Sequence, residues 1–182
     1  FSIFDVKFLK EIAAMKQKNL AAELLAKLLQ EQITVYKKNN VVQSMLFSER
    51  MQRLMNKYRN GLLTNAEVIS ELLEMASDIV KDHDAGKELG LTVEEKAFYD
   101  AITKPAGIKD FYDNETLIQL TQRLTELLRS NRTIDWQKKE TSRAAMRTLV
   151  RRLLKEFKYP PEGVEDATTT VISQCGMWVD QE

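Results

Sequence analysis

The sequence has few of the residues from which metal centres, nucleotide sites and disulfide frameworks are built. Its 182 residues include one cysteine, one histidine, six glycines and three prolines. A single cysteine excludes an intramolecular disulfide framework, and one cysteine with one histidine excludes a zinc site of ordinary Cys/His composition. The glycines are dispersed, so there is no glycine-rich phosphate loop of the Walker or Rossmann type. We therefore expect no cofactor and no metal ion in this chain.

An excess of charge and a long apolar run are also missing. Lys and Arg number 27, and so do Asp and Glu, so no global field attracts the protein to nucleic acid or to an anionic membrane. No apolar run approaches the ~18–20 residues of a membrane span, and the N-terminus lacks the layout of a signal peptide. We expect no membrane contact and a cytoplasmic location. Because the chain begins with Phe1 and not with Met, we expect a piece of a longer protein.

Apolar side chains recur at three- and four-residue spacing along most of the chain, which predicts amphipathic helices. The strict alternation of a half-buried strand is missing, and no period of about 20–50 residues repeats. We predict an all-α fold, a multi-helix bundle of about seven to eight helices with one core and no sheet. Residues 1–182 are expected to form a single cooperative domain, with a first helical half at 1–90 and a second at 91–182.

Capping residues and helix breakers set the expected helix bounds. The helix starts are marked by Asp5, by the capping boxes Thr64 with Glu67 and Thr92 with Glu95, and by Asp113 or Asn114. The stops are marked by Gly61, Gly90, Pro105 with Gly107, and the segment 159–161. The leucines between Leu20 and Tyr36 predict a further amphipathic helix. We expect a loop through 111–112, the longest helix at 135–157 and a last helix at 162–175.

Few side chains are candidates for catalysis, and each has a simpler interpretation. His83 lies between two aspartates in a charged segment near a helix C-terminus, which predicts a solvated side chain. Cys175 lies in the apolar half of the last helix, which predicts a buried small hydrophobe. Two pairs of carboxylates are of the kind that binds a hard cation or acts as acid and base: Glu94 with Glu95, and Glu71 with Glu74. In helical proteins, however, such pairs usually cap a helix or face solvent. We predict no catalytic residue.

The exception to the charge balance is the segment 132–158, which has nine basic and three acidic residues, a local charge of +6. Four-residue spacing places Arg143, Arg147, Arg151 and Lys155 in one row, the basic stripe, on the face away from the apolar side chains of this helix. With the neighbouring Arg152, these are the residues expected to contact DNA phosphates or an acidic partner surface. The alternative is a solvated face, paired with the acidic residues Glu162, Glu165 and Asp166.

Three segments carry a resemblance to a known family. They are KNLAAELL at 18–25, EEKAFYDA at 94–101 and the pattern IDW…R…LL…YPP at 134–161. With these segments, nearly the whole chain resembles the C-terminal helical region of the R subunit, the motor and nuclease subunit, of type I restriction enzymes. The parent protein would then resemble an ATP-dependent type I site-specific deoxyribonuclease.

The resemblance implies a function in assembly for this region. R subunits carry an N-terminal nuclease domain, two RecA-like translocase domains and a helical C-terminal region that binds the methyltransferase core. The nuclease carboxylates, the catalytic lysine and the ATP-binding motifs have no matching positions here, so ATP and Mg²⁺ are implied only for upstream domains. The implied partners are the methyltransferase (modification) subunit, the upstream translocase domains of the same chain, and double-stranded DNA contacted without sequence specificity.

Two other functions fit the residues. The first is a purely structural spacer that packs on the translocase domains, which a failed pull-down with the methyltransferase subunits would favour. The second is a stand-alone helical enzyme with an unrecognised carboxylate site. A large pocket that holds two or more carboxylates without a basic partner would favour the enzyme.

Overall fold

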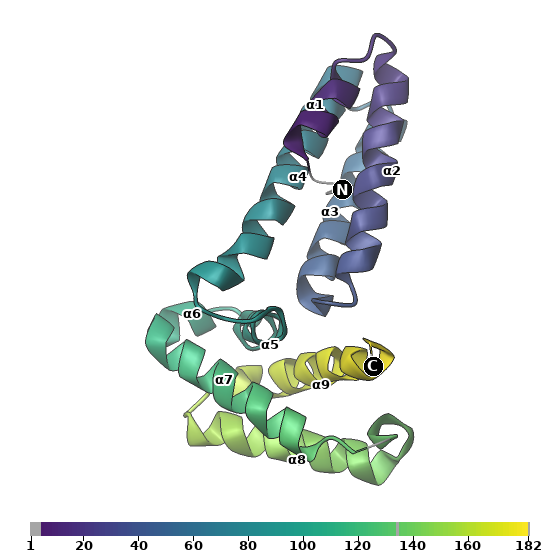
Figure 1. The fold of residues 1–182 in the computed structure, drawn as a ribbon. Helices are drawn as coiled ribbons and strands as arrows, with labels where there is room; N and C mark the ends of the chain where they lie inside the picture. Colours follow the sequence, from purple (N-terminus) through teal and green to yellow (C-terminus); the bar gives the residue numbers. More distant parts are fainter. Residues whose placement is uncertain (1–4, 134, 182) are drawn as a thin grey trace. The chain divides into compact units, whose positions relative to one another are not determined.

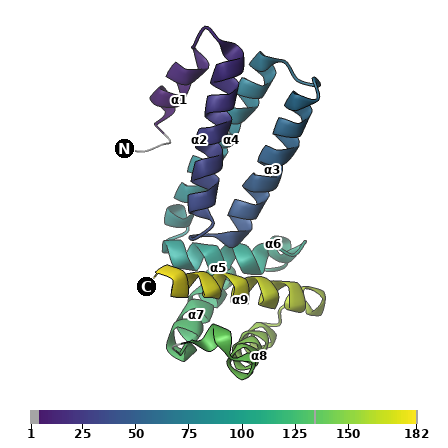
Figure 2. The same ribbon diagram turned by 90° about the vertical axis from the view of Figure 1, so that its right-hand side faces the viewer.

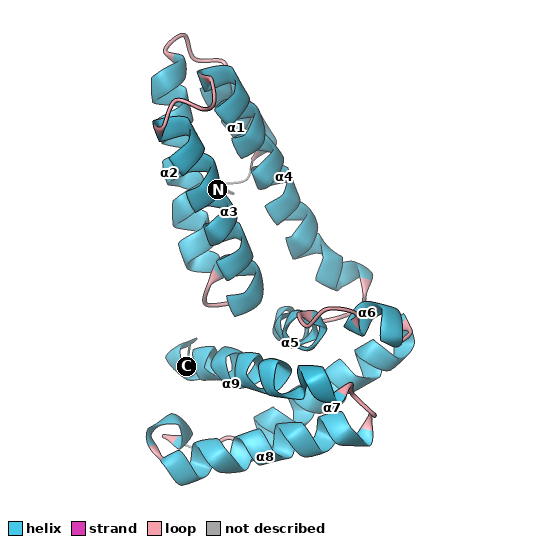
Figure 3. Ribbon diagram, turned by 180° about the vertical axis from the view of Figure 1, so that it is seen from behind, coloured by secondary structure: helices cyan, strands magenta, loops and turns pink. Residues whose placement is uncertain are grey.

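The computed structural model describes residues 5–133 and 135–181, and within these ranges every regular element is helical (Figure 3). Figure 1 labels the nine α-helices of the described chain, eight of which have eight residues or more. The prediction of an all-α fold without a sheet is confirmed for this part of the chain. No described helix is long and apolar enough to cross a membrane.

The helices follow one another with short connections. In chain order they are α1 (Val6–Ala13), α2 (Lys18–Tyr36), α3 (Val41–Arg59), α4 (Asn65–Glu88), α5 (Val93–Thr103), α6 (Ile108–Phe111), α7 (Asn114–Asn131), α8 (Glu140–Glu156) and α9 (Val164–Gln181). Two short 3₁₀ helices, η1 (Trp136–Lys138) and η2 (Pro161–Gly163), precede α8 and α9.

The chain divides into two compact units. The first comprises the described part of Phe1–Lys37 together with Gln43–Lys87, and the second comprises Lys38–Val42 and the described part of Glu88–Glu182. The buried apolar side chains form two clusters, where we predicted one core. The division falls close to the predicted halves 1–90 and 91–182, except that the connection 38–42 belongs to the second unit. Cooperative unfolding of the whole chain stays a prediction.

The predicted capping residues begin the helices as expected. The Asp5 carboxylate accepts a hydrogen bond of 3.0 Å from the amide of Lys7, and Asp113 accepts one of 2.7 Å from the amide of Thr116. Both capping boxes form, with reciprocal bonds between Thr64 and Glu67 and between Thr92 and Glu95. Each bond satisfies an amide that the first helical turn leaves without a backbone partner.

The core of the first unit is built from one face each of α1, α2, α3 and α4. Leu25, Leu29 and Ile33 of α2 pack in the same cluster as Met51 and Met55 of α3 and as the valine, isoleucine and leucine side chains of α4. Leu20 lies outside this face and is 49% exposed, although it belongs to the leucine pattern that predicted α2. The pattern is wider than the face that the neighbouring helices cover.

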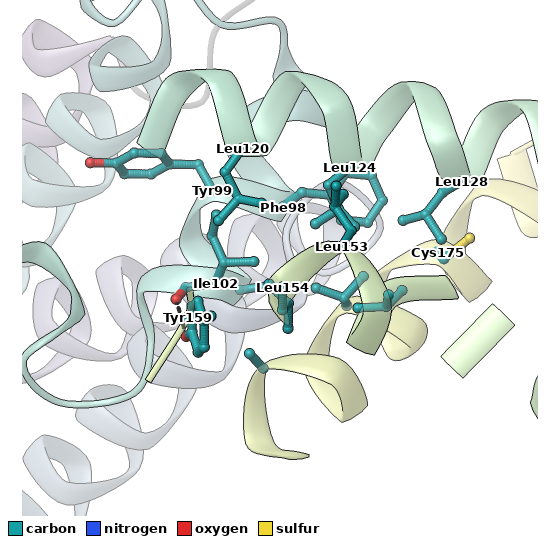
Figure 4. Packing of buried hydrophobic residues seen from close by; sticks show 14 of the residues in the cluster. Phe98, Tyr99, Ile102, Leu120, Leu124, Leu128, Leu153, Leu154, Tyr159 and Cys175 are labelled. Carbon is teal, nitrogen blue, oxygen red and sulfur yellow. Dashed lines mark hydrogen bonds between the residues drawn. The ribbon is translucent and has the colours of Figure 1, made fainter. Parts of the chain in front are cut away.

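The core of the second unit surrounds α5, as Figure 4 shows. Phe98 and Ile102 of α5 are fully buried in one cluster with residues of α7, α8 and α9. On α7, Leu117, Leu120, Leu124 and Leu128 recur at helical spacing, and each is completely buried. The Tyr159 hydroxyl donates a 2.5 Å hydrogen bond to the Ile102 carbonyl, which fixes the chain between α8 and α9 against α5.

A buried polar network holds the connection 38–42 within the second unit. The Asp100 carboxylate accepts from Lys96 Nζ at 2.5 Å and from Asn40 Nδ2 at 2.6 Å. On α9, Gln174 accepts from the amide of Val41 at 2.8 Å and donates to the Asn39 carbonyl at 3.2 Å. Buried polar groups need such partners because burial removes their contacts with water.

Three predicted elements differ from the structure. The last helix, predicted at 162–175, begins only at Val164, because Pro161–Gly163 form the 3₁₀ turn η2, and it continues to Gln181. The helix predicted at 135–157 begins only at Glu140, because Asp135 has the left-handed backbone angle φ 61° and the buried Trp136 starts a 3₁₀ turn. It is therefore shorter than α4, which has 24 residues. The loop predicted through 111–112 begins with the single turn α6, in which the Tyr112 amide bonds the Ile108 carbonyl. Burial of Ile108 stabilises this turn.

Candidate functional site

The basic stripe lies on α8, which packs against α7 and α9 through Met146, Val150, Leu153 and Leu154. Arg143, Arg147 and Arg151 lie on the flank of the helix, where their side chains are 34, 31 and 36% exposed. Arg152 and Lys155 are exposed. The five candidate residues thus lie on one helix, where three are partly buried and two are exposed.

Glu140 at the start of α8 neutralises two of the arginines. Its carboxylate accepts from Arg143 Nη2 at 2.5 Å and from Arg147 Nη2 at 2.9 Å. The hydrogen bond from Arg143, followed by the one from Arg147, lowers the pKa of the Glu140 carboxyl below its ordinary value. Arg143 also donates to the carbonyl of Gln137, which ties the 3₁₀ turn η1 to the first turn of α8. These contacts hold the guanidinium groups of Arg143 and Arg147 beside Glu140, at the start of α8.

A second carboxylate, Glu165 on α9, neutralises Arg151. Arg151 Nε and Nη2 donate to the two oxygens of Glu165 at 2.8 and 3.0 Å, a bidentate pair. The hydrogen bond from Arg151 lowers the pKa of Glu165, and the same bond raises the pKa of Arg151. Pairing with the acidic residues after α8, the alternative considered for the stripe, therefore occurs at Glu165. Asp166 instead pairs with Lys104, at 3.1 Å.

Two candidate cations remain available. Among the described residues, neither Arg152 nor Lys155 forms an ion pair. Lys155 still lies near enough to Glu165 to contribute to lowering the pKa of that carboxyl. Of the five candidate cations on α8, only these two are therefore available to an anion without competition from a carboxylate in the described structure.

The other candidate side chains occupy structural positions. His83 is exposed, and burial raises the pKa of the Cys175 thiol to about 12. Glu95 belongs to its capping box, and Glu94 accepts from Arg129 of α7. Glu71 and Glu74 are exposed on α4. Across the described residues, no group of three His, Cys, Asp or Glu side chains lies close enough to hold a metal ion.

Two features of the surface were missed from the sequence. One is Glu140, which lies three residues before Arg143, a spacing at which side chains pair on a helix; Arg147 lies one helical turn further on. The other feature is a groove of about 520 Å³ between α2 and α3 of the first unit. It has no sequence signature, because it depends on which helix faces the fold leaves uncovered.

Comparison with known proteins decides the family. Residues 1–181 match the sequence profile of the family described as "Type I restriction enzyme HindI endonuclease subunit-like, C-terminal". The chain belongs to this family. The resemblance inferred from the three sequence segments is thereby confirmed.

The chain matches a small part of the sequence of two curated endonuclease subunits. It is 39% identical over 174 residues to the type I restriction enzyme HindI endonuclease subunit of Haemophilus influenzae, covering 96% of this chain and 16% of that protein. It is 32% identical over 166 residues to the putative type I restriction enzyme MjaIXP endonuclease subunit of Methanocaldococcus jannaschii, covering 91% and 15%. The chain thus spans about one-sixth of the length of these relatives. No solved structure matches it.

Proposed function

We propose that this chain is a non-catalytic assembly domain, which docks the ATP-dependent DNA translocase of a type I restriction endonuclease subunit onto the methyltransferase core. The observation that carries the proposal is the match of residues 1–181 to the C-terminal family of these subunits. The two helical units, each with its own apolar core, supply rigid surfaces of the kind that protein partners bind.

Catalysis would then belong to other parts of the parent protein. The relatives named as endonuclease subunits are about six times longer than the segment matched here. Nuclease activity, and the ATP and Mg²⁺ that drive translocation, would reside in their remaining sequence. The upstream translocase domains would be the second partner of this chain, and the assembled enzyme would act in the cytoplasm.

Non-specific contact with double-stranded DNA is a second part of the proposal, supported by Arg152 and Lys155. Both side chains are exposed on α8, and phosphates attract such cations regardless of base sequence. The arginines at 143, 147 and 151 would contribute less, because a phosphate must compete with Glu140 or Glu165 for each guanidinium.

Deletion of this region from the full-length subunit tests the docking function. The subunit should then lose its binding to the purified methyltransferase core, while its ATP hydrolysis on DNA is retained. Binding at the wild-type level after the deletion would contradict docking and would favour the structural spacer.

A charge reversal in the full-length subunit tests the DNA contact. Arg152→Glu with Lys155→Glu should weaken low-salt DNA binding by about tenfold, because each lost phosphate contact lowers the affinity. The matched control is Arg53→Glu with Lys57→Glu, which reverses two exposed cations on α3. Equal effects of the two double variants would rule out a specific role for α8.

A further inference from the structure

Three arginines on the flank of α8 share their donors between two carboxylates. Arg143 and Arg147 each donate to a different oxygen of Glu140, at 2.5 and 2.9 Å. Arg151 donates through Nε and Nη2 to the two oxygens of Glu165, which it reaches because α8 and α9 lie side by side (Figure 2). Every oxygen of the two carboxylates therefore accepts a hydrogen bond from a guanidinium group.

These hydrogen bonds are of the kind by which arginine recognises phosphate. The planar guanidinium fork donates N–H bonds to the oxygens of a carboxylate or of a phosphate in the same way. Hydrogen bonds from the arginines lower the pKa of both carboxyls, so Glu140 and Glu165 carry their negative charge at neutral pH. Each carboxylate thus uses donors that would otherwise be open to a phosphate group.

The carboxylates are more exposed than the arginines that bind them. The side chains of both glutamates are 71% exposed, whereas those of Arg147 and Arg151 are 31 and 36% exposed. Either carboxylate can therefore turn into solvent without opening the core. Arg143 binds the Gln137 carbonyl through Nη1, a different nitrogen from the one that binds Glu140, so this contact remains when the carboxylate leaves. The departure of the carboxylates leaves cations in place along this flank of α8.

We propose that Glu140 and Glu165 compete with the phosphates of double-stranded DNA for these arginines and thereby restrain DNA binding by α8, an inference that rests on the DNA contact proposed above. A phosphate that binds one of these guanidinium groups must first displace a carboxylate of the same chain. The contact is then made chiefly by Arg152 and Lys155, and DNA leaves it readily. Five cations without competing carboxylates would hold the duplex more tightly.

The strength of the competition follows from the exposure of the ion pairs. A pair between exposed side chains is weak and corresponds to a factor of up to about five in an equilibrium constant. Bidentate geometry and several donors on one carboxylate place these pairs at the upper end of that range. Each carboxylate should therefore lower the affinity for DNA by about three- to fivefold. Because Glu140 and Glu165 bind different arginines, the two effects should combine to about tenfold or more.

Removing the two negative charges is the direct test. Glu140→Gln with Glu165→Gln, made in the full-length subunit, keeps the size of both side chains and should tighten binding to a DNA duplex by about tenfold. The matched control is Glu126→Gln with Glu162→Gln, which makes the same charge change at exposed residues without an ion pair in the described structure. At ~0.1 M salt, where separated charges are screened, the control should tighten binding by about twofold at most. Equal gains in the two variants would reveal a general charge effect and overturn the proposal.

The gain in affinity should also depend on the arginines that the carboxylates release. Arg147→Gln with Arg151→Gln is therefore introduced both into the wild type and into the variant Glu140→Gln with Glu165→Gln. The resulting loss of DNA affinity should be at least about fivefold larger in the variant, because only there are these arginines open to phosphate. Equal losses in the two backgrounds would contradict the competition. Circular dichroism verifies the fold, and if the combined variants misfold, Glu165→Gln with and without Arg151→Gln decides by a three- to fivefold difference.

The outcomes separate this inference from the DNA contact on which it rests. If Arg152→Glu with Lys155→Glu weakens DNA binding but Glu140→Gln with Glu165→Gln leaves it at the wild-type level, the competition is wrong while the DNA contact stands. If neither double variant changes DNA binding, both proposals are wrong. If removal of the two carboxylates tightens binding to the purified methyltransferase core and not to the duplex, the arginines bind a protein surface, and competition with DNA is excluded.

Discussion

Replacing Asp100 with alanine removes the carboxylate at the centre of the buried network in the second unit. Asp100 is 5% exposed and Lys96 is 8% exposed, so the substitution leaves a buried ammonium group without its anion. Breaking a buried pair from one side typically costs ~3–5 kcal/mol. The lower end, about 3 kcal/mol, applies here, because the long Lys96 side chain can shift its charge towards water. Asn40 would also lose a hydrogen bond to a charged group.

Urea unfolding of the chain, followed by far-ultraviolet circular dichroism, measures this free energy. The double variant Lys96→Met with Asp100→Leu removes both charges and should recover about 2 kcal/mol relative to Asp100→Ala, because no unpaired charge then remains buried. A loss below about 1 kcal/mol for Asp100→Ala would refute the reasoning, since it would mean that the pair is solvated. A double variant as unstable as the single one would refute it too.

Three further predictions concern single side chains. Cys175, whose pKa burial raises to about 12, should resist a thiol reagent at mildly alkaline pH in the folded protein and react promptly in urea. Leu124→Ala should lower the free energy of unfolding by ~2–5 kcal/mol, because the side chain is fully buried, while the exposed Gln122→Ala should change it by less than about 0.5 kcal/mol. The pair of Glu165 with Arg151 should stabilise the fold above pH 4.5, the ordinary pKa of Glu, and this contribution should disappear as the pH falls through the lowered pKa. A carboxyl titration by NMR should show that depressed pKa, and Arg151→Gln should raise it towards the ordinary one, while Arg147 and Lys155 still lower it.

Helix starts and stops could be predicted because their signals are local. Asp113 caps α7 through the amide three residues later, and the bond depends on no other part of the fold. Gly61 and Gly90, predicted as stops, both have the left-handed backbone angle that glycine adopts without strain. The all-α class followed from the same kind of signal, repeated along the chain.

The surface of α8 could be predicted only in part, because its partners come from elsewhere in the fold. Four-residue spacing correctly places the basic residues on one helix, but Glu165 reaches Arg151 only when α9 packs beside α8. The predicted helix start at Asp135 was wrong for a similar reason. Burial of Trp136 in the core of the second unit favours a 3₁₀ turn there, and this preference is not visible in apolar periodicity.

The ion pairs of α8 have a consequence for any measurement of DNA affinity against salt concentration. Binding to duplex DNA weakens with salt by a logarithmic slope of about 0.9 per phosphate neutralised, because counterions are released. Five free cations would give a slope of about −4.5, whereas Arg152 and Lys155 alone would give about −1.8. An arginine that exchanges Glu140 or Glu165 for a phosphate releases a carboxylate to be solvated by new counterions. Sodium ions taken up by that carboxylate offset those that leave the DNA, so a shallow slope would be the thermodynamic signature of these pairs.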